Sequence, residues 1–507
     1  MNQPININEN ALEQAAIELF ESLGYSAMDC MQEWAGDTSS LNRQSMRDVV
    51  LTDKLESALR QLNPQANDTA ITSAIDEITR DRTVLNPVTA NKEVHQLVKD
   101  GVRVQIRQAD GSMRGENLKV IDWDNPGNND FFLASQFWIA GDLGKKRPDL
   151  LGFVNGLPLL FIELKAAHND IKDAYDNNLT DYKTTIPQIF WYNSVIILSN
   201  GSESRMGTIS SKWEHFAEWP KIDSEKEPRT LSLPTIIRGS CEPSRFLDLV
   251  ENFTLYVGLR GAPVKLVAKN HQYLGVNNAV QALQSINEND GRLGVFWHTQ
   301  GSGKSFSMIF FSQKVLRKLP GNWSFVIITD RQELDGQIYD NFTDAGVVTE
   351  DYTQADSAVH LRQLLSEDHR LVFSLIHKFR TEPGQQHPVL SERSDIIVIT
   401  DEAHRSQYDT LANNMRTALP NASFLAFTGT PLIIGAERTK EVFGDYISVY
   451  DFKESIADKA TVPLYYENRI PELQLTNDDL NEDMANLLED AELDDEEERK
   501  VEHQFSR

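Results

Sequence analysis

The stretch Gly294–Met308, GVFWHTQGSGKSFSM, decides the fold class of this 507-residue chain. Its apolar start, Val295–Trp297, predicts a buried strand, and the glycine loop after it leads into an expected helix. Free N–H groups at a helix start bind anions, a lysine adds positive charge, and a serine hydroxyl can hold Mg²⁺. The stretch therefore predicts a phosphate-binding loop, with His298 where the usual pattern has glycine. The candidate nucleotide-binding residues are Gly301, Ser302, Gly303, Lys304 and Ser305.

Composition is that of an ordinary globular protein of two or three domains, with 40% hydrophobic and 9% aromatic residues. The formal net charge is −27, and Asp478–Glu498 alone contributes −12 because it has 12 acidic residues and no lysine or arginine. The acidic total excludes a uniformly basic nucleic-acid coat but leaves room for a local basic DNA channel.

The chain is expected to be cytoplasmic, without membrane contact. Cys30 and Cys241 are far apart and lack metal-ligand spacing, which favours inert thiols in a reducing compartment. The N-terminus has neither the basic nor the apolar region of a signal peptide, and no apolar run approaches the roughly 20 residues of a membrane span.

Hydrophobic periodicity predicts an α/β protein with a change of pattern near residue 235. Helices are expected at 9–32, 45–62, 70–100 and 169–185, and short strands at 117–123, 129–139, 149–154, 159–164 and 190–198. After a polar linker at 219–234, strands at 293–297, 324–329, 371–376, 395–400 and 423–427 alternate with helices. That alternation predicts a parallel sheet covered by helices on both faces. The acidic segment after residue 470 is expected to be an exposed helix or disordered.

The segment Asp395–Arg405, DIIVITDEAHR, places two carboxylates at the end of an apolar strand. Ligands of open α/β sheets bind at the carboxyl ends of the strands. Asp401 can hold Mg²⁺ opposite Ser305, and Glu402 can orient and deprotonate the attacking water, the two roles that phosphoryl transfer needs. A surface Asp-Glu pair is the alternative, and the phosphate loop about 100 residues upstream argues against it.

Three shorter motifs carry weaker signals. SFLAFTGTP at 423–431 ends a strand with Thr428 and Thr430, whose hydroxyls could link the ATP site to a nucleic-acid face; a plain turn is the alternative. IITDRQELDGQ at 327–337 carries Arg331, a candidate DNA-backbone contact or a solvated loop residue. KNHQY at 269–273 places Gln272 where it could read the adenine edge.

Together these motifs resemble a superfamily 2 helicase or translocase with a DEAH box, which makes His404 a coupling residue by that resemblance. Four sequence segments resemble more narrowly the motor (R) subunit of type I restriction enzymes: WHTQGSGKS, ITDRQELDGQ, DEAHRSQ and AFTGTPL. In that light His298 is a family trait rather than a defect of the loop.

The segment Arg147–Ala167, RPDLLGFVNGLPLLFIELKAA, predicts two apolar strands joined by an Asn-Gly-Leu-Pro turn. Asp149 starts the first strand, while Glu163 and Lys165 lie two apart on the second and so face the same side. Two carboxylates form an oxygen-rich Mg²⁺ site, and the lysine can stabilise or deprotonate a water that attacks a phosphodiester. This is the PD-(D/E)xK nuclease pattern, although many surface strands end in Glu-x-Lys.

The resemblance adds two further residues to the nuclease site. Its members carry Gln-x-x-x-Tyr on the following helix, where this chain has Asn178 and Tyr182, so Tyr182 matches and the shorter Asn178 departs from the pattern. Many nucleases of this branch also have a glutamate on the first helix, for which Glu13 is the candidate; a solvated helix face is the alternative.

The resemblance implies a PD-(D/E)xK endonuclease domain at 1–235, a first RecA-like ATPase lobe at 236–460, and an exit linker with an acidic tail at 461–507. No second RecA-like lobe is recognisable, so the chain is expected to be an N-terminal portion that binds ATP and cuts DNA weakly without translocating.

The implied cofactors are ATP and Mg²⁺, with S-adenosylmethionine only through a partner methyltransferase. The implied partners are double-stranded DNA and the methyltransferase and specificity subunits. Two alternatives stay open: a superfamily 2 motor whose N-terminal domain binds DNA without cutting it, and an inactive remnant.

Overall fold

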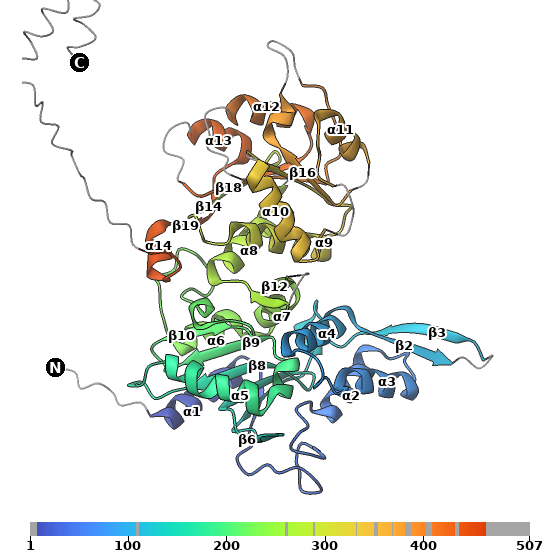
Figure 1. Ribbon diagram of the computed structural model, residues 1–507, viewed down its shortest axis with the longest axis vertical. Coiled ribbons are helices and arrows are strands. Elements are labelled where there is room, and N and C mark those ends of the chain that lie inside the picture. The colour runs from blue at the N-terminus through green and yellow to red at the C-terminus, as the bar shows by residue number, and fades with distance from the viewer. Residues whose placement is uncertain are drawn as a thin grey trace, which may run out of the picture. The chain divides into compact units, whose positions relative to one another are not determined.

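Two β-sheets, each with its own helices, organise the chain in the computed structural model (Figure 1). The structure describes residues 8–107, 111–258, 262–286, 289–330, 332–348, 353–367, 369–380, 387–401, 408–430 and 436–462. Residues 1–461 form one compact unit. The expected exit linker and acidic tail lie almost wholly outside the described residues.

The first sheet has seven strands among the described residues and mixes parallel with antiparallel pairs. Its order is β1 (Ser26–Asp29), β4 (Phe131–Ser135), β7 (Leu150–Val154), β8 (Leu157–Leu164), β9 (Val195–Ser199), β10 (Ser204–Gly207) and β11 (Ala217–Glu218). The strands β7, β8 and β9 are buried along their whole length, as their continuous apolar sequences require.

The helices around this sheet are shorter than the sequence pattern predicts. The helix expected at 9–32 is α1 (Glu9–Ser22), because Gly24 takes a φ of 96° and β1 follows. The one expected at 45–62 is α2 (Thr52–Leu62), and that at 70–100 divides into α3 (Asp68–Thr79) and α4 (Pro87–Asp100), since proline favours a helix start. The helix expected at 169–185 is a π-helical turn, Ala174–Leu179, continued by α5 (Thr180–Thr185).

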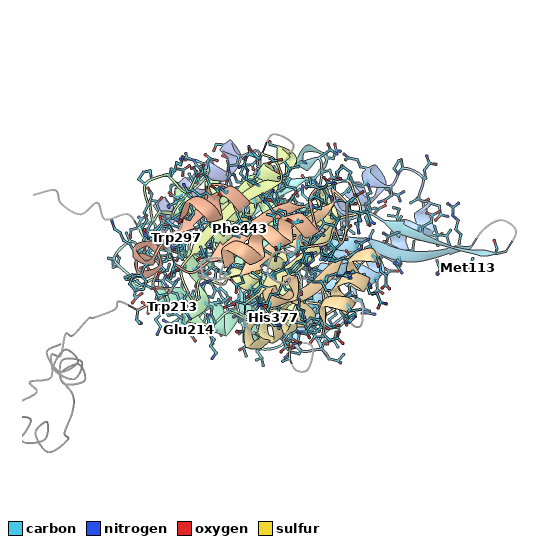
Figure 2. The ribbon with its side chains drawn as sticks, turned by 90° about the horizontal axis from the view of Figure 1, so that it is seen from above. Met113, Trp213, Glu214, Trp297, His377 and Phe443 are labelled. Carbon is cyan, nitrogen blue, oxygen red and sulfur yellow. The ribbon has the colours of Figure 1, made fainter. Side chains whose placement is uncertain are left out.

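Two hairpins replace parts of the expected strands. The pair β2 (Val102–Arg107) and β3 (Met113–Leu118) takes the place of a strand at 117–123, and Figure 2 shows Met113 at its far end, with 61% of its surface exposed. The run at 129–139 contains β4 and the start of β5 (Ile139–Gly141), which pairs with β6 (Gly144–Lys146). The run at 190–198 begins with a 3₁₀ turn, Pro187–Trp191, so β9 starts only at Val195.

The second sheet is fully parallel and has six strands among the described residues. Its order is β16 (Leu371–Leu375), β15 (Ser324–Thr329), β17 (Ile396–Asp401), β18 (Ser423–Thr428), β14 (Arg292–His298) and β19 (Tyr446–Tyr450). The first five confirm the predicted strands. The edge strand β19 was not predicted, because its sequence, YISVY, is short and alternates apolar with polar residues.

Helices cover both faces of this second sheet, as the alternating sequence pattern predicts (Figure 1). They are α8 (Asn270–Gln284), α9 (Lys304–Lys318), α10 (Gln332–Asp344), α11 (Ala358–Ser366), α12 (Tyr408–Ala418), α13 (Ala436–Phe443) and α14 (Phe452–Ala457). The chain is therefore a mixed α/β protein with a parallel sheet in its C-terminal half. Among the described residues, no helix is both long and apolar enough to cross a bilayer.

The segment between the sheets packs back onto the N-terminal half. It contains α6 (Leu233–Ser240), α7 (Pro243–Asn252), β12 (Thr254–Val257) and β13 (Val264–Val267). Lys265 of β13 is 1% exposed and donates hydrogen bonds to the side-chain oxygen of Asn91 (2.9 Å) and the carbonyl of Asn193 (2.8 Å). Burial lowers its pKa to about 7. Both cysteines, Cys30 and Cys241, are buried free thiols.

Candidate functional site

Two antiparallel strands bring Asp149, Glu163 and Lys165 together at one end of the first sheet. Asp149 lies just before β7, and the register pairs Leu150 with Ile162, so Asp149 faces the end of β8. The backbone N–H of Leu164 donates to Asp149 Oδ2 at 2.8 Å, and Lys165 Nζ lies 3.3 Å from Glu163 Oε1. The three residues that the sequence predicts for a nuclease site are therefore neighbours.

Burial gives the two carboxylates an unusual charge state. Glu163 is 1% exposed, and its burial, with the nearby charge of Asp149, raises the pKa of Glu163 well above its usual range. Burial also raises the pKa of Asp149. Among the described residues, Glu163 Oε2 is a buried oxygen without a hydrogen-bond partner. A buried carboxylate with an open lone pair is costly unless a cation or proton meets it, so the site fits a hard metal ion.

A cation here would not be enclosed by protein side chains alone. The described residues contain no group of three Asp, Glu, His or Cys side chains arranged to hold a metal. Asp149 and Glu163 would supply two ligands, and water and substrate oxygens would supply the rest, an arrangement typical of Mg²⁺.

Glu13, on the N-terminal helix α1, is linked to the site by Gln136. The sequence analysis predicted Glu13 but not Gln136. Gln136 Nε2 donates to Glu13 Oε2 at 2.7 Å, and the backbone N–H of Gln136 donates to the carbonyl of Asp149 at 2.9 Å. Gln136 has a φ of 54°, which is uncommon for a residue other than glycine and often marks a functional site. Burial raises the pKa of Glu13 to about 7, so this helix adds a titratable carboxyl beside the site.

Asn178 and Tyr182 approach the site from the helical segment after β8. Asn178 Nδ2 donates to Glu163 Oε1 at 2.5 Å, and Tyr182 is 7% exposed, with its ring 5.8 Å from that of Phe161 in an edge-on arrangement. Asn178 lies in the π-helical turn, a distortion that is frequent at functional sites. The short asparagine thus reaches Glu163. The burial of Tyr182 favours a positioning role over an exposed contact with DNA.

The loop between β14 and α9 has the backbone of an anion site. Gly301 and Gly303 take φ values of 81° and 88°, and α9 begins at Lys304 with its first N–H groups facing the loop. Gln272 Nε2 donates to the carbonyl of Gly303 at 3.0 Å. A Cβ on Gly303 would lie 2.7 Å from that nitrogen, so this position requires glycine for its φ and for its contact.

The remaining predicted motor residues fall at the carboxyl ends of the same parallel strands. Asp401 ends β17 and is in register with Phe427 of β18, which is in register with Phe296 of β14. Two strand spacings separate Asp401 from β14, about 10 Å. Ser305 is half-buried in the first turn of α9, and Lys304 Nζ is 3.4 Å from the carbonyl of His298.

Thr428 and Thr430 close the end of β18 with a local turn. The Thr428 hydroxyl donates to the carbonyl of Thr430 at 2.9 Å and accepts from the Thr430 backbone N–H at 3.3 Å. Glu402, His404 and Arg331 lie outside the described residues, and their predicted roles stay predictions.

His298 is a buried structural residue below the loop. Its Nε2 is 2.6 Å from Ser448 Oγ, and the Ser448 hydroxyl donates to Glu225 Oε1 at 2.5 Å. Glu225 also accepts from the backbone N–H of Val449 at 2.9 Å. Burial lowers the pKa of His298 well below its usual value, so the ring is neutral at pH 7. The side chain that replaces the usual glycine therefore ties β14 to β19 and to the polar segment before α6.

Comparisons with known proteins follow the same two halves. Residues 6–215 match the family described as type I restriction enzyme R protein N terminus, and residues 271–499 match the SWI2/SNF2 ATPase family. The HindI endonuclease subunit of a type I restriction enzyme from Haemophilus influenzae is 36% identical over 91% of this chain and 46% of its own length. Over nearly its whole length, the chain is therefore similar to the R subunits of type I restriction enzymes.

A second R-subunit relative is the putative MjaIXP endonuclease subunit of Methanocaldococcus jannaschii, 31% identical over 99% of this chain and 50% of its own length. The chain thus spans about half the length of the curated R subunits it matches. Among solved structures, a nuclease-deletion mutant of the Type ISP restriction-modification enzyme LlaGI overlaps 38% of this chain and 21% of its own, at 17% identity and a TM-score of 0.29.

A cavity of about 300 Å³ opens beside the phosphate loop. The loop residues Gly301, Ser302 and Gly303 line it together with Gln272 and Phe306. Residues of the first half form another part of its wall: Met206, Ser211, His215, Ala217 and Trp219. No sequence motif pointed to these residues, because they reach the loop only through the packing of the two halves.

Proposed function

We propose that this chain is the nuclease and ATP-binding part of the restriction (R) subunit of a type I restriction-modification system. In this proposal it cuts unmodified DNA with Mg²⁺, and the cut is coupled to ATP-driven translocation by the complete subunit. The observation that carries the proposal is the buried Asp149–Glu163–Lys165 cluster, with an open carboxylate oxygen, in the same compact unit as a glycine-rich phosphate loop.

The nuclease half, proposed to be a PD-(D/E)xK domain at 1–235, would use these residues in distinct ways. Asp149 and Glu163 would hold Mg²⁺, and Asn178 fixes the rotamer of Glu163. Mg²⁺, when bound, neutralises charge on the phosphate and lowers the pKa of a bound water. Lys165 would hold the attacking water by hydrogen bonds and carry its positive charge to the phosphodiester oxygens.

The motor half, proposed to be a first RecA-like lobe at 236–460, would bind ATP at the phosphate loop. Lys304 and the N–H groups of α9 would meet the phosphates, and Ser305 and Asp401 would hold Mg²⁺. The base would enter the cavity beside Gln272, whose amide already bonds to Gly303 and Lys269. Glu402 would position the water, while Thr428, Thr430, Arg331 and His404 would couple hydrolysis to DNA.

The proposal extends to partners and location. Double-stranded DNA is the proposed substrate, and methyltransferase and specificity subunits are the proposed partners. S-adenosylmethionine would enter only through the methyltransferase, and the assembly would work in the cytoplasm. The similarity to curated R subunits, of which the chain spans about half the length, supports these statements.

Nicking of supercoiled plasmid by this chain with Mg²⁺ tests the nuclease proposal. We expect wild-type protein to produce open circles and Glu163→Gln to produce none above background. The exposed Glu18→Gln on α1 is the control. If Glu163→Gln nicks as fast as wild type, the nuclease assignment is wrong. If no variant nicks, a motor with a non-cleaving N-terminal domain fits better.

Thermal unfolding of the same variant tests the metal site separately. The folded-state pKa of Glu163 is raised, so its carboxyl favours the folded state below its usual pKa and loses that contribution as pH rises through the raised value. At a pH above that raised value and without metal, Glu163→Gln is expected to raise Tm by about 2–4 °C, since a buried unsatisfied charge is removed. Mg²⁺ should then raise the Tm of wild type and not that of the variant. Equal stabilisation of both by Mg²⁺ would contradict the site.

Gly303→Ala tests the phosphate loop. The new methyl group would strain a left-handed backbone by about 1–2 kcal/mol and displace Gln272. We expect ATP affinity, measured by titration with a fluorescent ATP analogue, to fall at least about tenfold. Gly301→Ala is the matched comparison, because its φ is similar but the nearest atom to its Cβ is 3.9 Å away. A smaller loss is expected there, and wild-type affinity in Gly303→Ala would exclude this loop as the ATP site.

A further inference from the structure

We propose that Trp34, Trp138 and Arg147 form a stacking platform that binds an unpaired nucleobase of DNA next to the nuclease centre. The proposal rests on the nuclease function proposed above. It adds a ligand class to that function, which is single-stranded or locally opened DNA.

The two tryptophans form a stacked pair at the surface. Their ring centroids are 6.1 Å apart with an interplanar angle of 16°, and 45% of the surface of Trp34 is exposed. The guanidinium carbon of Arg147 lies 5.1 Å from the centroid of the Trp138 ring. Exposed aromatic rings with an arginine beside them are what proteins use to bind single strands, because every base has a face that can stack. A nucleobase can extend this stack at the exposed Trp34.

Buried polar residues hold Trp138 in place. Its indole N–H donates to the carbonyl of Met31 at 3.2 Å. Its backbone carbonyl accepts from the guanidinium of Arg43 at 2.9 Å, and Arg43 is 2% exposed and packs 4.0 Å from the centroid of the Phe137 ring. Because these bonds fix the Trp138 ring, it forms a firm support on which Trp34 stacks.

The loop that carries Trp34 is held by a second buried charged residue, Glu33. The preceding residue, Glu33, is 4% exposed and accepts hydrogen bonds from the hydroxyls of Ser39 (2.5 Å) and Ser40 (2.7 Å) and from the backbone N–H of Leu41 (3.3 Å). These bonds fix the stretch between β1 and α2, which is more than 20 residues long and without helix or strand. Loops of this length in a packed domain are usually functional. Fixing the rings before binding reduces the entropy lost when a base stacks.

Trp138 and Arg147 lie on the same connecting segments as Gln136 and Asp149, between β4 and β5 and between β6 and β7. Trp138 follows Gln136 by two residues, and Gln136 contacts both Glu13 and Asp149. Arg147 precedes Asp149 by two residues, and its charge acts on Glu13. The pairing of Ile139 with Lys146 brings these two segments side by side. A DNA strand whose phosphate reaches Asp149 would therefore pass near Trp138 and Arg147.

The charges near the platform include cations that can meet the phosphates of a nucleic acid. Arg47 pairs with Asp142 at 2.5 Å, and Lys146 pairs with Asp181, so these four charges balance. Lys145 is exposed on the same hairpin. Stacking with local cations gives affinity without sequence preference.

Binding of a short single-stranded oligonucleotide that contains 2-aminopurine tests the proposal on the full chain without Mg²⁺. We expect wild type to quench the 2-aminopurine on binding, because the base stacks on indole. Trp34→Ala should lose most of the quenching and bind about tenfold more weakly, while Trp34→Phe should keep most of both. Leu143→Ala is the control, because it removes an exposed apolar side chain from the nearby β5–β6 hairpin, and it should behave as wild type. Fully paired duplex should bind all four proteins equally.

Three results would overturn the platform. The first is wild-type binding and quenching in Trp34→Ala. The second is an equal loss for duplex and single strand, which would indicate general DNA affinity. The third is unchanged DNA binding with loss of methyltransferase-subunit binding, which would make the surface a protein interface. Circular dichroism and plasmid nicking by the same proteins separate the two proposals: if wild type stacks the base but never nicks, the nuclease function fails and the platform stands.

Discussion

Lys304→Ala is expected to weaken binding of MgATP about 100-fold and to remove DNA-stimulated ATP hydrolysis. Lys304 is the first residue of α9, where its ammonium joins the free N–H groups of the helix start. Losing a charge-assisted contact to a phosphate costs about 1.5–3 kcal/mol in binding, and more in the transition state, where negative charge on the γ-phosphate must be stabilised.

The measurements for Lys304→Ala are titration of this chain with a fluorescent ATP analogue and hydrolysis by the assembled restriction complex. Lys453→Ala, an exposed lysine on α14, is the control for loss of one positive charge. Lys304→Arg should not restore activity, because the planar guanidinium does not replace a compact ammonium. Hydrolysis at wild-type rate in Lys304→Ala would remove this loop from the ATP site.

Lys165→Ala is expected to lower DNA cleavage about 1,000-fold and to leave ATP hydrolysis unchanged. Lys165 Nζ lies 3.3 Å from Glu163 Oε1 and 3.0 Å from the carbonyl of Leu164, so its charge is fixed at the carboxylates. A positioned group that transfers a proton or stabilises developing charge contributes about 10²–10⁴-fold to a reaction rate.

Cleavage and hydrolysis should be measured on the same preparation of the Lys165→Ala complex. Lys172→Ala serves as the control, because Lys172 is seven residues after Lys165, is exposed, and pairs with Asp176 at the surface. A parallel loss of both activities would indicate a folding defect instead of a catalytic role. Cleavage at wild-type rate would show that Lys165 is not part of the centre.

The sequence predicted the strands that carry the proposed site residues, because buried strands are continuous apolar runs and the polar residues at their ends stand out. Asp149, Glu163 and Asp401 were found in this way, each at the end of such a run. The limits of the helices were harder, since 9–32 is interrupted by Gly24 and 70–100 by Pro87, each of which acts through local backbone geometry.

The residues that the sequence did not predict act through contacts that are distant in the chain. Ser448 is 150 residues from His298, and Glu225 is 223 residues from Ser448, so no local pattern links them. The contacts of Gln136 with Glu13 and Asp149 are made with a positive φ at Gln136. A glutamine in the sequence does not indicate such a backbone conformation. Edge strand β19 depends on pairing with β14, which supplies the partner that its own short sequence does not specify.

The buried contacts of Lys265 bear on how the chain folds during translation. Its ammonium, together with the hydroxyl of Tyr256, satisfies Asn91 deep within the N-terminal half. A newborn chain that has emerged from the ribosome only as far as residue 235 would lack both groups and would leave the apolar side of α1 and α4 without its cover. We therefore expect the first half to reach its full stability only after β13 has been translated. A shortened gene that is meant to yield a stable nuclease fragment should accordingly end beyond Val267.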